Sequence, residues 1–286
     1  MKTLLLAGHL GPTLSAPVRG LLPWAADTLR VLHRVNAPLA WAGWLNVGLA
    51  LLALVLLPLD QRLVAGALVW LKPLKFSLSI VVYAWTLAWL LADLPAPAQA
   101  AVRVISWGVA LSMVVEQAVI FTQAARGTTS HYNASSALNG ALFGLMGLFI
   151  LVNTVLTAWA LYLAWRYQPH GTAAYGWGLR LGLLVFWLGS VLGGFMIHQQ
   201  KHTVGAADGG PGLPGLGWST VAGDLRIAHF LGMHALQLLP LLGWGLGLLL
   251  PRQAVALTWV GAVAYAAAVA ALLLQALAGQ PLWAGR

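Results

Sequence analysis

The sequence predicts an all-α integral membrane protein: a bundle of about seven transmembrane helices with an N-terminal interfacial amphipathic helix. Three observations predict this fold class. Hydrophobic residues make up 60% of the 286 positions and charged residues only 7%, whereas soluble domains carry about a quarter charged residues. Seven stretches approach or exceed the roughly 20 apolar residues that a membrane-spanning helix needs. None of them alternates in polarity as the strands of a membrane barrel do.

The chain is expected to divide into a short N-terminal segment and one membrane domain. In residues 1–36, the stretch 21–35 places Asp27, Arg30 and Arg34 along one helical face and leucines along another, which is typical of a helix at the membrane surface. Residues 37–286 are expected to form a single seven-helix domain. Its spans are predicted at about 38–57, 74–92, 101–124, 137–165, 175–197, 227–250 and 254–278.

The positive charge predicts a membrane orientation and not a nucleic-acid partner. The formal net charge is +9, but the basic residues stand singly at span ends, where they anchor a helix to lipid headgroups. Lysine and arginine divide almost equally between the two sides, so the N-terminal cluster decides, because the first span often sets the orientation. We expect a bacterial-type inner (plasma) membrane protein with its N-terminus in the cytoplasm.

Polar residues gather at alternate junctions between the predicted spans. The first junction contains Lys72 and Lys75, the third runs from Arg126 to Asn133, and the fifth from His198 to His234. Alternate junctions of a seven-span bundle lie on the same side of the membrane, so these groups should share one face. The second and fourth junctions are interpreted as plain linkers, and no continuous polar path to the other face is expected.

Four histidines at the fifth junction form a predicted metal site. His198 and His202 are four residues apart, which places them on one helical face if the fifth helix continues that far. His229 and His234 are five apart and point about 140° from each other, so they cannot easily share one ion. The alternative is that these are interfacial histidines hydrogen-bonded to backbone or water.

The cofactor of this site is predicted to depend on histidine, because the chain has no cysteine. Imidazole suits zinc or copper, and it is also an axial ligand of haem. We therefore expect a histidine-ligated metal, zinc or copper, or a b-type haem, with its identity unknown.

Two carboxylates are predicted to carry chemistry. Glu116 is the only glutamate and lies inside the third predicted span, where an ionisable group counts as a functional hypothesis. Its depth below the face matches that of His234, so a Glu116–His234 contact is expected, with Lys75 or Arg126 as alternative partners. Asp208 is the second proton acceptor that we consider. A purely structural role for Glu116 is the alternative.

Several residues of the same face are predicted to bind an anionic group such as a phosphate, a carboxylate or a haem propionate. They are Lys75, Arg126, His131 and Arg226. Arginine suits bidentate contacts, whereas lysine acts as a point charge. Lys72 is instead expected to snorkel toward lipid phosphates.

Residues 205–219, with six glycines and two prolines, are interpreted as a re-entrant or lid loop over a polar pocket, or as a flexible connector. Asp224, just beyond this loop, is expected to cap the sixth span by accepting hydrogen bonds from its first backbone amides.

Three function classes follow from this pattern. The first is a metal- or haem-dependent membrane enzyme or redox protein with the histidine-rich site. The second is a transporter or receptor for a small anionic or lipidic ligand, with Glu116 as a proton-coupled group. The third is a membrane scaffold or assembly factor whose polar face binds another protein.

Overall fold

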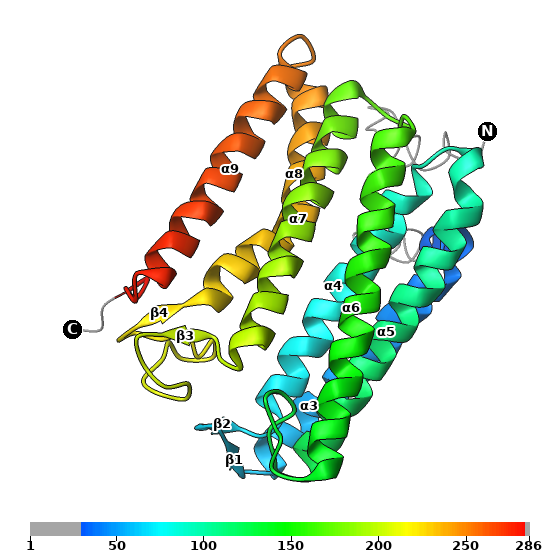
Figure 1. The fold of residues 1–286 in the computed structure, drawn as a ribbon. Helices are drawn as coiled ribbons and strands as arrows, with labels where there is room; N and C mark the ends of the chain where they lie inside the picture. Colours follow the sequence, from blue (N-terminus) through cyan, green and yellow to red (C-terminus); the bar gives the residue numbers. More distant parts are fainter. Residues whose placement is uncertain (1–29, 284–286) are drawn as a thin grey trace.

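The fold is a bundle of long helices whose axes run roughly side by side (Figure 1). The computed structural model describes residues 30–283. Seven of the described helices are long and apolar enough to cross a membrane, so the predicted fold class is confirmed. They are α3 (Ala37–Leu59), α4 (Leu71–Ala92), α5 (Gln99–Ala125), α6 (Ala137–Arg166), α7 (Ala173–Gln199), α8 (Leu225–Leu249) and α9 (Ala254–Leu277).

The start of α3 is fixed by a capping residue. Asn36 accepts a hydrogen bond from the Leu39 amide at 3.4 Å and donates to Ser106 Oγ at 2.8 Å, which ties this helix to α5. Residues 30–35 are also helical, and most of the interfacial helix predicted for residues 21–35 lies outside the described residues. The division into a tail and a single domain stays a prediction.

Helix packing divides the bundle into two groups. Helices α3 to α6 form one group, and α7 to α9 form the other, with α6 against α7 and α4 against α8 as the contacts between them. Tyr83 of α4 joins the groups, because its hydroxyl donates to Asn153 of α6 at 2.9 Å and its ring stacks on Phe186 of α7 at 5.3 Å. A hydrophobic core of buried residues from α3 to α8 surrounds this contact.

Glycines allow the closest approach between α7 and α8. A Cβ atom added at Gly189 would lie 2.9 Å from the backbone of Gly232, so neither position has room for a side chain. Gly243 likewise meets the backbone of Ala174 on α7. The sequence also suggests close packing at Gly140 and Gly144, but both face open space, so that expectation is wrong.

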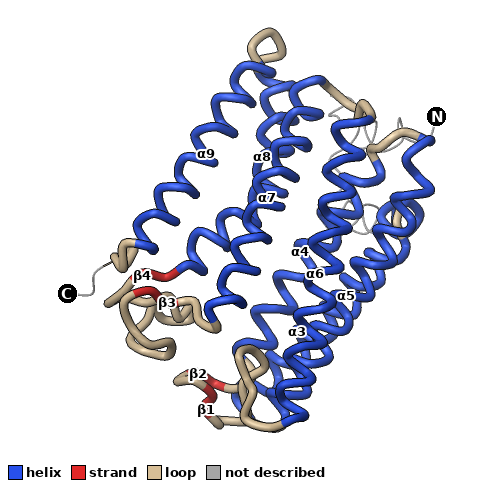
Figure 2. The backbone as a smooth tube through the Cα atoms, in the orientation of Figure 1, coloured by secondary structure: helices blue, strands red, loops and turns tan. Residues whose placement is uncertain are grey.

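Two short β-pairs and the longest loops gather at one end of the bundle, shown at the bottom of Figure 1 and in tan and red in Figure 2. β1 (Leu63–Val64) pairs with β2 (Ala67–Leu68), and β3 (Thr203–Val204) pairs with β4 (Gly223–Asp224), both antiparallel. We call this the loop end. The opposite end carries the turns at 93–98, where the 3-10 helix η1 (Ala96–Ala98) lies, at 167–172 and at 250–253.

Candidate anion-binding site at the loop end

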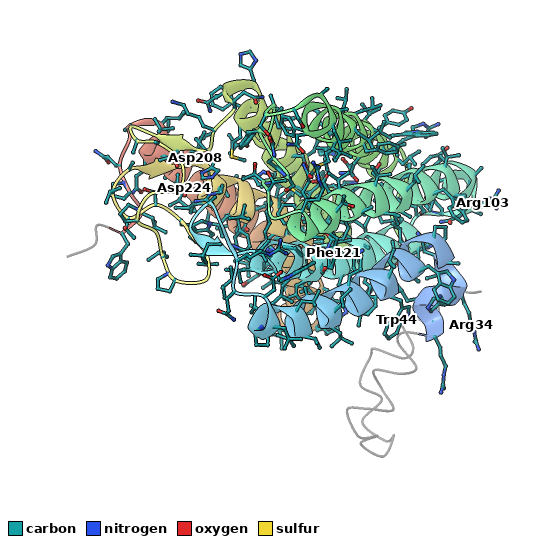
Figure 3. The ribbon with its side chains drawn as sticks, turned by 90° about the horizontal axis from the view of Figure 1, so that it is seen from below. Arg34, Trp44, Arg103, Phe121, Asp208 and Asp224 are labelled. Atoms are coloured by element: carbon teal, nitrogen blue, oxygen red, sulfur yellow. The ribbon has the colours of Figure 1, made fainter. Side chains whose placement is uncertain are left out.

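The loop end brings together the three polar junctions that the sequence places on one face. Arg62 at the first junction donates to the Ala125 carbonyl at the end of α5, 3.2 Å away. Lys75 on α4 donates to the Gly215 carbonyl in the loop between α7 and α8, 3.2 Å away. Figure 3, seen from below, shows Asp208 and Asp224 close together in that loop region, with Arg34 and Arg103 on the far side.

Three cations from two helices converge at this end. Lys72 lies close enough to Lys75 and Arg226 for each pair to repel electrostatically, and Lys75 likewise repels Arg226. Within residues 30–283, Arg226 alone of the three forms a salt bridge, to Asp224 at 2.6 Å, while the buried Glu116 attracts Lys72 without a direct contact. Neither lysine forms a salt bridge within residues 30–283. The cluster therefore holds more positive than paired negative charge.

Asp224 has the structural role that the sequence predicts. It is the N-cap of α8, and its Oδ1 accepts from the Arg226 amide at 3.0 Å. Burial raises its pKa, but the hydrogen bonds and the charge of Arg226 outweigh that effect, so the pKa is lowered overall. Asp224 is therefore ionised and offsets the charge of Arg226.

Lys72, His131 and Glu116 form a connected group behind the cations. Lys72 Nζ lies 3.1 Å from His131 Nδ1, and His131 Nε2 lies 3.7 Å from Glu116 Oε1. An ammonium group can only donate, so Nδ1 must accept and the ring proton belongs on Nε2, facing Glu116. The expectation that Lys72 snorkels to lipid is wrong, because its amine lies against this histidine.

The predicted Glu116–His234 contact is also wrong. Among the described residues the salt-bridge partner of Glu116 is His131, while His234 Nδ1 lies 3.3 Å from Gln237 Oε1. The side chain of Glu116 is only 4% exposed, and its Oε2 has no hydrogen-bond partner. A buried carboxylate oxygen without a partner marks a place where a proton or a ligand would be favourable.

His131 is held as a neutral group. Burial lowers its pKa well below the usual value, and the charges of Lys72 and His202 lower it further. Its ring lies among the aromatic rings of Phe76 and Phe143, with centroids 5.7 and 6.2 Å away. Ser130 Oγ is a second neighbour of Nδ1 at 3.1 Å.

The loop between β3 and β4 is attached to two of the cations through its backbone. Lys75 Nζ donates to the carbonyls of Gly215 and Leu216 at 3.2 and 3.4 Å, and Arg226 Nη2 donates to that of Gly217 at 2.5 Å. Gly215 and Gly217 have φ angles of 73° and 71°, a conformation that favours glycine. Three consecutive carbonyl oxygens of the loop thus accept hydrogen bonds from the two cations.

A pocket of about 320 Å³ lies within this loop, lined by residues that include Thr203, Asp208, Ser219 and Arg226. Asp208 accepts hydrogen bonds from the amides of His202 and Thr203 at 3.2 and 2.9 Å. Its contacts are therefore those of a residue that shapes the loop. Its proposed role as a proton acceptor remains a prediction.

The four predicted metal-ligating histidines have separate surroundings. α7 ends at Gln199, and Gln200 follows with a φ of 57° in the left-handed region. His198 and His202 therefore do not share a helical face. His202 Nδ1 lies 3.3 Å from Asp208, and His229 Nδ1 lies 2.7 Å from the Gly189 carbonyl. Within residues 30–283, no group of three or more His, Asp or Glu side chains is arranged to hold a metal ion.

Arg126 lies outside the cation cluster. Its guanidinium donates to Gln123 Oε1 at 2.6 Å and to Asn139 Oδ1 at 2.8 Å, which joins the end of α5 to the start of α6. The structure thus brings together Lys75, Arg226 and His131 of the predicted anion-binding set and adds Lys72. The spacing of Lys72 and Lys75, three residues apart on one helix, is the sequence signal for the addition.

Comparison with known protein families, with curated proteins and with solved structures finds no match to this chain, so its site is interpreted from its own geometry.

Proposed function

We propose that this membrane protein is a receptor or transporter for a small anionic or lipidic molecule, whose anionic group binds Lys72, Lys75 and Arg226. One observation carries the proposal: three cations that repel one another lie beneath a glycine-rich loop, and among the described residues only Arg226 of the three forms a salt bridge, while Glu116 attracts Lys72 without a direct contact. An anion placed among them would relieve the repulsion and replace the weak carbonyl contacts of Lys75.

The other function classes receive less support. The metal- or haem-dependent enzyme rested on four histidines sharing a site, and their surroundings are separate. A membrane scaffold or assembly factor does not require cations to gather at one place, so the cation cluster does not favour this class. The N-terminus-in orientation in an inner membrane stays a prediction from the charge distribution.

Glu116 and His131 are expected to couple anion binding to the uptake of a proton. An anion at Lys72 would draw the ammonium N–H groups away from His131 Nδ1, which could then accept a proton. The protonated ring would attract Glu116, 3.7 Å from Nε2. Binding should therefore take up a proton, which is visible as a dependence of the binding enthalpy on the ionisation enthalpy of the buffer.

Thermal unfolding with inorganic phosphate tests the proposal. The purified protein is unfolded at constant ionic strength, and its 15 tryptophans report the transition. A ligand at 100 times its Kd adds about 2.7 kcal/mol to the free energy of unfolding, so Tm should rise with phosphate. The K72Q and K75Q variants should each weaken phosphate binding by roughly 10-fold or more.

Lys201→Gln is the matched control, because Lys201 carries the same charge and is exposed at the same end. It should bind phosphate as the wild type does. Arg226 is not substituted, since its loss would leave the buried Asp224 unpaired. If a K72Q/K75Q double variant keeps the full phosphate-induced rise in Tm, the cation cluster is not the binding site.

A further inference from the structure

We infer that the anionic ligand is a membrane lipid, which enters sideways from one leaflet into a slot between α4 and α8. This inference rests on the proposed function and names its ligand class. The slot has cations at its mouth, a hydrogen-bonded floor, and a middle section that the described chain leaves exposed.

Polar residues of α4 lie on one stripe. Lys72, Lys75, Ser79, Tyr83 and Thr86 follow one another at intervals of three or four residues. With successive residues about 100° apart, all five fall within an arc of about 80°. The spacing is visible in the sequence, and the stripe ends at Thr86, before α4 reaches the opposite end of the bundle.

A matching stripe lies on α8. Arg226, Phe230, His234 and Gln237 also fall within an arc of about 80°. Phe230 contacts His234, with ring centroids 4.3 Å apart, and it contacts Trp218 of the loop at 5.5 Å. This stripe is cationic at the loop end, aromatic below it, and polar again one turn deeper.

The two stripes approach each other at two levels. At the loop end they are bridged by consecutive loop residues, since Lys75 holds the Leu216 carbonyl and Arg226 holds that of Gly217. Deeper in the bundle they touch directly, because Gln237 Nε2 donates to Thr86 Oγ1 at 3.3 Å. The slot therefore has a closed floor and a mouth covered by the loop.

The middle of the slot is not filled by the described chain. Ser79, one turn below Lys75, is exposed, and Phe230, one turn below Arg226, is 40% exposed. Val82, three residues beyond Ser79, is exposed too. In a bilayer these surfaces would meet lipid tails, so the slot is open to the side.

The depth of the slot matches one leaflet. Lys75 and Thr86 are eleven residues apart, as are Arg226 and Gln237, which corresponds to roughly 16 Å of helix. Half of the hydrocarbon core of a bilayer is about 15 Å thick. A phosphate headgroup at Lys75 and Arg226 would therefore place its acyl chain beside Ser79 and Phe230 and end it near Thr86.

Retention of defined lipids tests this inference. The protein is reconstituted with dioleoyl phosphatidylglycerol or dioleoyl phosphatidylcholine, and bound lipid is measured by native mass spectrometry. We expect the anionic lipid to be retained at least about 10-fold more than the zwitterionic one. Ser79→Trp should fill the slot and lose this retention while phosphate still raises Tm as in the wild type.

Leu78→Trp is the matched control, because it adds the same side chain one residue away on another face, at a position that is 54% exposed. It should retain phosphatidylglycerol and phosphate alike. If S79W does not fold, S79F should show a smaller loss of the same kind.

The outcomes separate this inference from the proposed function. If S79W and S79F retain phosphatidylglycerol like the wild type, or if the two lipids are retained equally, the lipid slot is ruled out. The anion site then still stands if K75Q weakens phosphate binding. If K72Q/K75Q leaves phosphate binding unchanged, the anion site fails, and the lipid inference fails with it.

Discussion

The two ends of the bundle both contain buried polar side chains, but they satisfy them differently. At the opposite end, Asp93 accepts a hydrogen bond from Tyr175 at 2.5 Å, and the His170 amide donates to the Asp93 carbonyl at 2.8 Å. Arg180 donates to the Ala164 carbonyl at 2.8 Å and to Gln168 at 2.9 Å. At the loop end, within the part of the chain that the structure describes, Lys75 donates its hydrogen bonds to loop carbonyls alone, and one oxygen of Glu116 has no hydrogen-bond partner.

This difference favours the loop end over the opposite end as the place where the proposed ligand would bind. At the opposite end the turns at 93–98 and 167–172 are joined through Asp93, and their interpretation as plain linkers stays a prediction. Their polar groups bond one another and leave little for a ligand to gain. At the loop end, by contrast, Lys75 donates to loop carbonyls, which the proposed anion would replace.

The comparison also predicts opposite responses to pH. Burial raises the pKa of Asp93 to about 6, against the opposing effects of Tyr175 and His170. Burial lowers the pKa of His131 well below its usual value. The loop end should therefore lose stability in acid while the opposite end gains it.

The largest expected effect is at Asp93. A carboxyl with a raised pKa stabilises the fold fully below pH 3.8, and this stabilisation is lost as pH rises through about 6. At pH 7, Asp93→Asn should therefore raise the free energy of unfolding by roughly 3 kcal/mol, at about 1.4 kcal/mol per unit of pKa. Thermal unfolding at pH 4 and pH 7 measures this, and the gain should largely vanish at pH 4. An equal gain at both values would contradict a buried ionised carboxylate.

The next effect is the acid sensitivity of His131. Because the pKa of His131 is lowered in the folded state, its contribution to the free energy of unfolding is full above pH 6.5. This contribution is lost as pH falls below 6.5, because the unfolded chain then binds more protons than the folded chain does. In the D93N background, the free energy of unfolding should fall by up to about 1.4 kcal/mol per pH unit for each such histidine, and Tm should fall with it. Burial and Arg226 also lower the pKa of His202, so H131Q should remove part of the slope and H131Q/H202Q most of it. A slope unchanged in the double variant would place the acid sensitivity elsewhere.

The smallest effect concerns the floor of the slot. Thr86→Val keeps the shape of the side chain and removes the hydrogen bond from Gln237, which should lower the free energy of unfolding by about 1 kcal/mol. Phosphate binding at the mouth should be unchanged, as a phosphate titration of Tm would show. Thr258→Val in α9, whose hydroxyl bonds only within its own helix, is the control for losing a buried hydroxyl.

Sequence patterns predict the helices well because hydropathy decides which segments cross a bilayer. They also predict the Asp224 cap, which depends on residue type at a helix start. Contacts between helices are harder to predict. Glu116 and His234 have comparable depths, but α5 packs against α3, α4 and α6, so equal depth does not bring these side chains together.

The histidine pair shows a second limit of prediction. Spacing by four places His198 and His202 on one face only within a helix, and the left-handed Gln200 ends α7 between them. The stripes of α4 and α8, by contrast, lie wholly within helices. Their intervals of three and four residues could have been recognised from the sequence alone.

The pairing of β3 with β4 has a consequence for how this loop can change. The antiparallel pair joins Thr203 to Asp224 and Val204 to Gly223, so the two ends of the loop between them lie next to each other. The length of this loop therefore does not determine the distance between α7 and α8. Doubling the length of a flexible loop costs only about 0.6 kcal/mol in closure entropy. An epitope inserted between Gly209 and Gly210, neither of whose carbonyls accepts a hydrogen bond from the cations, should therefore be tolerated and would show which side of the membrane this end faces.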